Sequence, residues 1–256
     1  MSEPPEDSLP GSVRASSFGE RAALYDRLRP SYPASILPSL LGDARVVADV
    51  GAGTGKLTAL LAAAGLDVTA VEPDPGMRAE LSRRLPSVPV LAGSGEALPL
   101  ADASVDAVTY AQAWHWVRPA DGLREAARVL RPGGVLALVW NTDGGGVDWL
   151  DRLNELYGGG RAAVEELPVA SAELAAAAGF GPVEQVDVAW EQALRPGDLP
   201  ELAMTWSAIA TLPAAERDTV LGAIADLAAT HPDLAGRETV TSPHVCRGFA
   251  LRRLPL

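Results

Sequence analysis

Between residues 46 and 140, short runs of apolar residues alternate with longer stretches in which apolar and polar residues are mixed. The runs are rich in Val and Ala, and their near-continuous hydrophobicity is typical of parallel strands that are covered on both faces. The mixed stretches contain many good helix formers. This alternation predicts an α/β sheet. The predicted strands span 46–50, 67–71, 88–91, 105–110 and 135–140, and the predicted helices span 57–64, 76–85 and 119–130.

On either side of this region the pattern is weaker. Residues 1–14 are polar and rich in proline, so we predict that they are disordered. Apolar residues at helical spacing predict a helix over 15–28, and the prolines that follow separate it from a second helix over 34–41. After residue 149 we predict helices over 150–156, 172–178, 200–211 and 213–229, and strands over 183–190 and 245–251.

Composition and charge limit the class of protein. The chain has 256 residues, of which 48% are hydrophobic, and this is enough for one well-packed domain. A formal net charge of −12 argues against a nucleic-acid partner, because binding to phosphates depends on Lys and Arg. The N-terminus lacks a signal-peptide pattern, and no apolar run approaches the roughly 20 residues of a membrane span. We therefore predict a cytoplasmic protein without a membrane association.

The Cys and His residues predict neither disulfides nor a metal site. A single cysteine, Cys246, and three histidines provide neither a disulfide framework nor a recognisable zinc spacing, so no metal site is predicted. Cys246 lies in the last predicted strand, far along the chain from the glycine-rich turn described next. His231 and His244 are interpreted as surface or edge residues without a role.

The stretch with the strongest chemical signal is a glycine-rich turn between the first predicted strand and helix. It reads Asp-Val-Gly-Ala-Gly-Thr-Gly-Lys over 49–56. Glycines permit positive φ and leave no Cβ between the backbone and a ligand, and the following helix directs its partly positive N-terminus at the same place. The next predicted strand ends at Glu72, at the edge where open α/β sheets bind ligands. A dinucleotide fingerprint requires a third glycine where this chain has Lys56.

The spacing G-x-G-x-G resembles motif I of the class I S-adenosylmethionine-dependent methyltransferases. In that family an acid about 20 residues downstream holds the ribose hydroxyls, and Glu72 is at that position. The resemblance implies the following cofactor-binding residues in this stretch: Asp49, Gly51, Ala52, Gly53, Gly55 and Glu72. A nicotinamide oxidoreductase or another phosphate-binding protein on a similar fold remains an alternative, which Lys56 disfavours.

Other segments extend the resemblance. The family's N-terminal helix carries A-x-x-Y-D and then R-P-x-Y-P, which Ala22, Tyr25, Asp26 and 29–33 match. In relatives such helices cover the cofactor and wall the substrate pocket, which implies that Tyr25 and Arg29 bind the cofactor and that Tyr32 binds the substrate. The alternative is that both tyrosines only pack this lid onto the sheet. R-x-L-R-P-G-G over 128–134 is a further family signature with a structural role.

The segments after the second and third predicted strands resemble the adenine-binding parts of the family. The resemblance implies that the adenine end contacts Pro73, Met77, Ser94, Gly95 and Glu96. Met77 is equally compatible with core filler. Many relatives have Asp where this chain has Ser94. A hydroxyl still accepts a hydrogen bond, so we expect weaker binding of the adenine rather than a loss of binding.

The run after the fourth predicted strand is Ala-Gln-Ala-Trp-His-Trp-Val over 111–117, and a subset of the family has a similar run there. The resemblance implies that Ala111 and Gln112 contact the cofactor. His115 is interpreted either as a general base or, with more weight, as a residue that positions the loop. Trp114 and Trp116 are predicted to line an apolar substrate pocket, although both rings are also large enough to fill space beneath the lid.

The resemblance implies an α/β fold with a doubly wound, seven-stranded, mostly parallel sheet, an antiparallel last strand and a helical cap. We expect one domain over 15–256, divided into lid helices (15–42), a cofactor-binding core (43–140) and substrate-side elements (141–256). The implied activity is methyl transfer from S-adenosylmethionine, which becomes S-adenosylhomocysteine, to a small organic acceptor of secondary metabolism. Oxygen is the favoured acceptor atom, with nitrogen and carbon as alternatives. A non-methylating enzyme, a cofactor-binding regulatory module, and a monomer or a homodimer all remain open.

Overall fold

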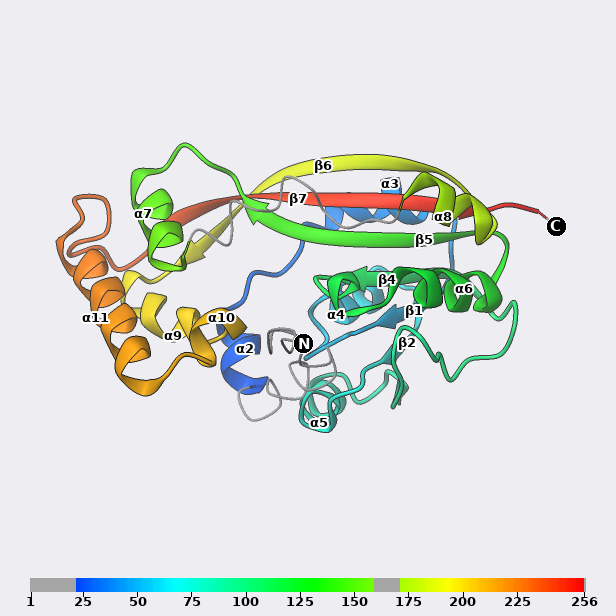
Figure 1. Ribbon diagram of the computed structural model, residues 1–256, viewed down its shortest axis with the longest axis horizontal. Helices are drawn as coiled ribbons and strands as arrows, with labels where there is room; N and C mark the ends of the chain where they lie inside the picture. Colours follow the sequence, from blue (N-terminus) through cyan, green and yellow to red (C-terminus); the bar gives the residue numbers. More distant parts are fainter. Residues whose placement is uncertain (1–21, 159–170, 256) are drawn as a thin grey trace, which may run out of the picture.

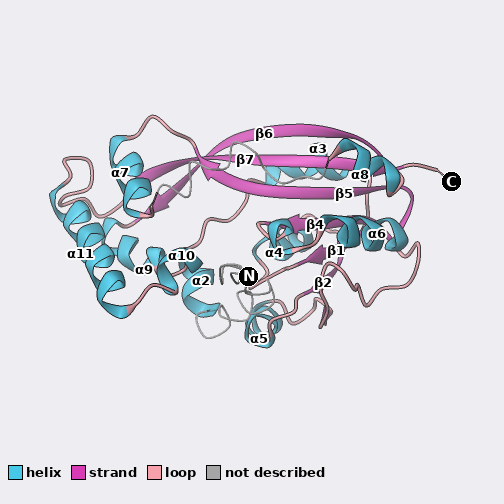
Figure 2. Ribbon diagram, in the orientation of Figure 1, coloured by secondary structure: helices cyan, strands magenta, loops and turns pink. Residues whose placement is uncertain are grey.

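The computed structural model describes residues 22–158 and 171–255. The predicted tail over 1–14 and the beginning of the first predicted helix lie outside these residues. Seven strands form one sheet in the order β3-β2-β1-β4-β5-β7-β6 (Figures 1 and 2). The strands are β1 (Val46–Val50), β2 (Asp67–Val71), β3 (Val90–Leu91), β4 (Val105–Ala111), β5 (Leu130–Asp143), β6 (Phe180–Leu194) and β7 (Val240–Arg253).

The strands β1 to β5 run parallel, whereas β7 is antiparallel to both of its neighbours, β5 and β6. From β1 the chain continues to β2 and β3 on one side of that strand. It then returns from β3 to β4, which lies on the other side of β1, so the strand order reverses there. Ligands of open α/β sheets bind at such a switch point, beyond the carboxyl ends of the strands. The predicted sheet of seven mostly parallel strands with an antiparallel last strand is confirmed.

Helices cover both faces of the sheet. Those in the first half are α2 (Ala22–Leu28), α3 (Leu37–Leu41), α4 (Lys56–Ala63), α5 (Pro75–Arg84) and α6 (Pro119–Val129), with 3-10 turns η2 (Ala34–Ile36) and η3 (Trp114–Trp116). Those in the second half are α7 (Asp148–Leu156), α8 (Ala172–Ala177), α9 (Leu199–Ala203), α10 (Ser207–Ala210) and α11 (Ala214–Thr230), with η4 (Pro196–Asp198).

The alternation of side chains along each strand divides the core into two layers. On one face α3 and α4 pack on the sheet through buried leucines, among them Leu40 and Leu61. On the other face α6 and α8 pack through Leu123 and Ala175. Both layers are apolar because the parallel strands have no face in contact with water.

A third apolar cluster lies beyond the carboxyl edge of the parallel strands. There α7, α9, α10 and α11 gather around the far ends of β5, β6 and β7 (Figure 1). All three strands are longer than predicted, because the antiparallel ladder continues past the parallel sheet and supports this cap. The helix predicted over 200–211 is divided into α9 and α10. At the break the Thr205 hydroxyl donates a 2.6 Å hydrogen bond to the carbonyl of Leu202.

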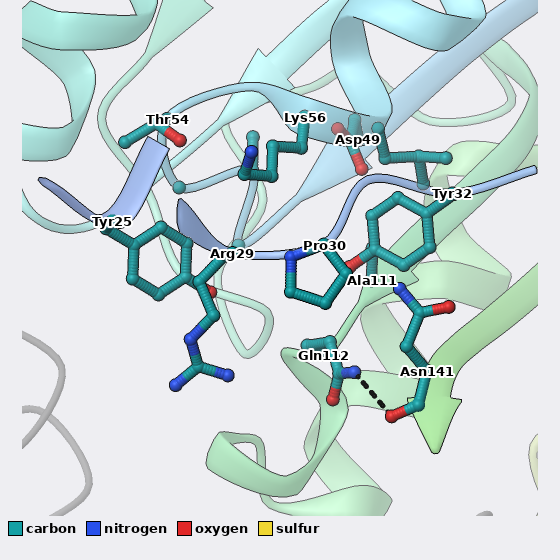
Figure 3. A pocket seen from close by; sticks show the side chains of 14 residues that line it. Tyr25, Arg29, Pro30, Tyr32, Asp49, Thr54, Lys56, Ala111, Gln112 and Asn141 are labelled. Carbon is teal, nitrogen blue, oxygen red and sulfur yellow. Dashed lines mark hydrogen bonds between the residues drawn. The ribbon is translucent and has the colours of Figure 1, made fainter. Parts of the chain in front are cut away.

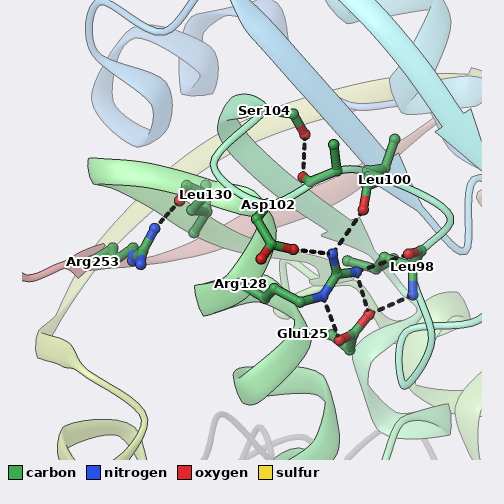
Figure 4. Close-up of polar contacts among 9 residues, drawn as sticks. Leu98, Leu100, Asp102, Ser104, Glu125, Arg128, Leu130 and Arg253 are labelled. Carbon is green, nitrogen blue, oxygen red and sulfur yellow. Dashed lines mark hydrogen bonds and ion pairs between the residues drawn. The ribbon is translucent and has the colours of Figure 1, made fainter.

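The signature over 128–134 includes a left-handed residue, Gly133, with a φ of 78°, and it begins with an arginine that is extensively hydrogen-bonded. The Arg128 guanidinium donates to Glu125 on its own helix and to the carbonyls of Leu98 and Leu100, at 2.8–2.9 Å (Figure 4). It also pairs with Asp102 at 2.8 Å. These contacts raise the pKa of Arg128 and fix the segment that leads into β4.

The interpretation of His231 and His244 as surface or edge residues is wrong. Both side chains are buried, with 4% and 5% of their area exposed. His231 ends α11 and lies 2.8 Å from Asp148 at the beginning of α7, so it joins two cap helices. His244 lies on β7 beneath the cap, which only the pairing of β7 with both neighbours could reveal. No helix within the described ranges is both long and apolar enough to span a bilayer.

Candidate functional site

The glycine turn lies at the carboxyl end of β1, beside the switch point. Gly51, Gly53 and Gly55 all have positive φ, between 58° and 86°. A Cβ on Gly51 would lie 2.5 Å from the Cβ of Ala113, and one on Gly55 would lie 2.9 Å from Leu81. A Cβ on Gly53 would meet no protein atom within 4 Å. Gly51 and Gly55 are therefore required by packing, whereas Gly53 borders open space that a ligand can enter.

Glu72 faces this turn from the end of β2. One oxygen of its carboxylate accepts a 2.9 Å hydrogen bond from the backbone N–H of Gly53, and the other accepts one of 2.9 Å from Asp74. Burial raises the pKa of Glu72, and the two backbone donors oppose that effect. Because each carboxylate oxygen has a second lone pair, the group can still accept hydrogen bonds from a ligand's hydroxyls.

Asp49 is buried below the turn, with 1% of its area exposed. It accepts hydrogen bonds from the hydroxyls of Thr58, at 2.6 Å, and Thr109, at 2.9 Å. Burial raises the pKa of Asp49 to about 6, although the two hydroxyls partly offset this effect. The turn is thus backed by a carboxyl group whose pKa is raised by burial.

A pocket of about 500 Å³, here called the cofactor pocket, opens above the turn. Its lining comes from residues 25–32, from the glycine turn and from the ends of β4 and β5 (Figure 3). Nine predicted site residues line it: Tyr25, Arg29, Tyr32, Asp49, Gly51, Ala52, Gly53, Ala111 and Gln112. Five lining residues were not predicted as site residues: Pro30, Thr54, Lys56, Leu57 and Asn141.

The helix α2 is fastened to the turn by Asp26. Its carboxylate accepts a 3.1 Å hydrogen bond from the hydroxyl of Thr54 and lies 2.7 Å from a guanidinium nitrogen of Arg84. Lys56 adds two contacts, one of 2.5 Å to the backbone oxygen of Asp26 and one of 3.8 Å to its carboxylate. These contacts hold Tyr25 and Arg29, which are on or next to α2, over the pocket.

Gln112 and Asn141 form the floor of the pocket. Gln112 has a φ of 56°, in the left-handed region that residues with a side chain rarely adopt. Its amide donates a 3.1 Å hydrogen bond to the backbone oxygen of Asn141 (Figure 3). A polar residue directly after the apolar run of β5 is the signal that could have identified Asn141 from the sequence.

The residues predicted for the adenine end are not among the described residues that line the pocket. Met77 is 4% exposed, in the first turn of α5, where its N–H donates to the capping side chain of Asp74. Ser94 forms an isolated bridge with Ala97, and Glu96 accepts a 3.1 Å hydrogen bond from the N–H of Arg118. The roles of Pro73, Met77, Ser94, Gly95 and Glu96 in binding stay predictions.

The run over 114–116 folds as η3, and its three side chains differ in environment. Trp114 is 1% exposed and packs edge to face on Tyr110, with ring centroids 4.9 Å apart, beneath Gly122 of α6. This geometry favours the space-filling interpretation of Trp114. His115 is exposed and packs against Trp116, and neither is among the residues that line the cofactor pocket. Desolvation by the surrounding protein and the positive charge of Arg29 lower the pKa of His115, which favours the neutral ring.

The site fits the nucleoside cofactor that the resemblance implies. Open space borders the backbone at Gly53, and the carboxylate of Glu72 is fixed beside it by the turn's own N–H. Tyr25 and Arg29 also line the pocket, with the guanidinium carbon 5.1 Å from the centre of the tyrosine ring. These features match a sugar with two hydroxyls attached to a larger polar group.

Comparisons with known proteins identify the family of this chain. A family model described as a methyltransferase domain matches residues 48–138. An uncharacterized methyltransferase of Mycobacterium tuberculosis is 44% identical over 230 residues, which cover 90% of this chain and 92% of that protein.

Two solved structures share the fold at lower identity. One is a protein of Anaeromyxobacter dehalogenans assigned as a type II methyltransferase, with a TM-score of 0.66 and 24% identity over 89% of this chain and 99% of that one. The other is the geranyl diphosphate C-methyltransferase of Streptomyces coelicolor in complex with S-adenosyl-L-homocysteine, with a TM-score of 0.53 and 17% identity over 98% of this chain and 100% of that one. The glycine turn, the acid beside it and the long match to the mycobacterial protein show that this chain belongs to the class I S-adenosylmethionine-dependent methyltransferases.

Proposed function

We propose that the cofactor pocket binds S-adenosylmethionine and that the chain methylates a small organic acceptor, with oxygen as the favoured acceptor atom. The observation that carries this proposal is the pairing of Gly53 with Glu72. The turn is open where a nucleoside would approach, and a buried carboxylate is held there by the turn's own N–H. A structure on the same fold, under 25% identical, contains S-adenosyl-L-homocysteine, which is consistent with this choice of ligand.

Different residues around the pocket would bind different parts of the cofactor. Glu72 would accept hydrogen bonds from the ribose hydroxyls, and the backbone at Gly51 and Gly53 would let the ligand approach closely. When bound, the cofactor supplies a methyl group on a positively charged sulfur. The protein's contribution is then to hold the acceptor in line with that group, which can lower the barrier by roughly 7–11 kcal/mol.

His115 is the proposed base. Its ring is exposed near the carboxyl end of β4, and its lowered pKa leaves it able to accept a proton at pH 7. Such a base contributes about 10²–10⁴-fold to the rate where the acceptor must lose a proton. An acceptor that is already ionised would not need this residue.

The experiment that tests the function has two parts. Calorimetric titration with S-adenosylhomocysteine should give a micromolar or tighter dissociation constant, whereas NAD should not bind. Incubation with radiolabelled cofactor and a panel of phenols, enols, amines and carboxylic acids should label a hydroxyl-bearing acceptor. Tighter binding of NAD would contradict the cofactor assignment, and labelling of amines alone would contradict the choice of oxygen.

A further inference from the structure

A second pocket, here called the cap pocket, lies beside the cofactor pocket under the helices α7 and α9. The space among its lining atoms, part of which is open to solvent, is about 400 Å³. Most of its wall is apolar and comes from cap residues that include Trp149, Leu153, Leu202 and Trp206. Among the described residues that line it there is no Asp, Glu, Lys or Arg. The wall therefore suits an uncharged, mainly apolar molecule.

One side of the cap pocket is polar. It is formed by Gln192 on β6 and by Ser242 and His244 on β7. Ser242 pairs with Gln192 in the antiparallel ladder, and His244 is two residues further along, so the three side chains share one face of the sheet. Ser242 and His244 are only 2% and 5% exposed. Polar groups buried in an apolar pocket favour a ligand that can hydrogen-bond with them.

Asp143 lies next to this row. It is directly opposite His244 in the ladder, with 4.0 Å between its carboxylate and Nδ1 of the histidine. Its other oxygen accepts a 2.8 Å hydrogen bond from Asn154 on α7. A carboxylate in this position disfavours an anionic ligand in the pocket, because like charges repel strongly where water is scarce.

The cap pocket and the cofactor pocket share a wall. Pro30 lines both of them. Arg29 lines the cofactor pocket, and its guanidinium stacks at 3.8 Å on Trp206, which lines the cap pocket. The Arg29 guanidinium also donates hydrogen bonds to the hydroxyl and the carbonyl of Thr205, both at 2.8 Å. Its polar atoms are therefore used in contacts within the wall between the two pockets.

A second connection runs along the sheet. The Asn141 side chain, at the cofactor pocket, accepts a 3.1 Å hydrogen bond from the ring nitrogen of Trp190. Trp190 in turn stacks on His244, with ring centroids 5.0 Å apart. His244 of the polar row is thus linked through Trp190 to Asn141, one of the two residues on the floor of the cofactor pocket.

From these observations we infer that the cap pocket binds the methyl acceptor, and that the acceptor is an uncharged, mainly apolar molecule with an oxygen that hydrogen-bonds to the row of Gln192, Ser242 and His244. This inference rests on the proposed function. It names the class of acceptor and three specificity-determining residues. Phosphorylated and other anionic acceptors are excluded by the apolar wall and by Asp143.

The test uses 2-naphthol and 2-naphthyl phosphate as probes, titrated into the full chain saturated with S-adenosylhomocysteine. We expect 2-naphthol to bind with a submillimolar dissociation constant and the phosphate to bind at least about 10-fold more weakly. Leu202→Trp, which fills the wall, should weaken 2-naphthol binding at least about 10-fold, and Ser242→Ala should weaken it several-fold. Leu212→Trp is the matched control, because Leu212 packs on the same cluster without lining the pocket.

S-adenosylhomocysteine affinity is measured separately for every variant and should stay within about 2-fold of the wild type. The inference is overturned if 2-naphthol does not bind, if the phosphate binds as tightly, or if Ser242→Ala and Leu202→Trp both leave 2-naphthol binding unchanged. Ser242→Ala keeps the test decisive if Leu202→Trp fails to fold. If the wild type does not bind S-adenosylhomocysteine, the proposed function is contradicted. Titration of 2-naphthol into the protein without S-adenosylhomocysteine would then still test the cap pocket.

Discussion

The ammonium group of Lys56 lies 2.5 Å from the backbone oxygen of Asp26 and 3.8 Å from its carboxylate. Lys56 occupies the position at which a dinucleotide-binding fingerprint has its third glycine. In this protein its side chain connects the lid helix α2 to the glycine turn. Thr54 and Arg84 contact the same carboxylate. The lid and the cofactor turn are thus joined by one acidic side chain.

Asp26→Ala should weaken S-adenosylhomocysteine binding by about 10-fold, or ~1.4 kcal/mol, because Tyr25 and Arg29 would no longer be held over the pocket. Isothermal titration calorimetry measures the effect. Arg27→Ala, which removes an exposed ion pair between α2 and Glu201, is the control and should change the affinity little. Equal affinity for wild type and Asp26→Ala would show that the contacts of Asp26 with the glycine turn do not support cofactor binding.

Gly53→Ala should reduce cofactor affinity at least about 10-fold, because the added methyl group enters the space that the ligand would occupy. Gly65→Ala is a matched control: Gly65 also has positive φ, 80° against 58°, and open space around its Cβ position, but it ends α4 away from the pocket. Both variants should lose about 1 kcal/mol of stability from backbone strain. Equal binding losses in the two variants would mean that strain, and not the ligand space, explains the effect.

Glu72→Gln should lower the affinity for S-adenosylhomocysteine by about 10-fold, since hydrogen bonds to a charged group are worth roughly 1.5–3 kcal/mol. The neutral amide keeps the shape of the side chain, but its NH2 group cannot accept one of the two hydrogen bonds from Gly53 and Asp74, so the melting temperature should also fall. Glu80→Gln, on α5 and paired with Arg83, serves as the comparison. A change in melting temperature without a change in affinity would assign Glu72 to the fold alone.

The buried carboxyl of Asp49 should make stability depend on pH. Its pKa is about 6 in the folded protein against 3.8 when unperturbed, so the folded state binds a proton more tightly than the unfolded state. Stability from this group is therefore present at low pH and is lost as the pH rises toward 6. Relative to Asp49→Asn, the wild type should lose about 2 kcal/mol of unfolding free energy between pH 4.5 and 7.5, measured by urea denaturation. A difference that is independent of pH would contradict the raised pKa.

His115→Ala should reduce turnover by about 10²-fold or more while the cofactor dissociation constant stays within about 2-fold, if the ring acts as the base. Because its pKa is lowered from 6.5, wild-type turnover should rise with pH through that lowered value and be level at neutral pH. Single-turnover rates measured between pH 5 and 8 provide both readouts. Unchanged turnover and an unchanged pH profile would assign His115 to positioning the loop.

Much of the cofactor pocket could be predicted because its determinants are local. Gly51, Gly53 and Gly55 are required by backbone conformation within a single turn, and strand length determines where Glu72 emerges. Asn141 and Thr54 were missed although each is adjacent to a recognised element. Their contribution depends on which side chains happen to face the same opening, and spacing along the chain does not encode this.

By itself, the sequence determined the order of strands and helices, the glycine turn and the acid beside it, because hydrophobic period and backbone freedom are properties of short segments. Only the tertiary structure decided that Asp26 meets Lys56 across 30 positions, that Trp114 fills the core, and that His244 is buried opposite Asp143. These relationships arise from the packing of the lid on the turn and from the register of β7 between β5 and β6. Packing and register both depend on contacts between distant segments, whose free energy is gained only when the whole sheet and its cap are assembled.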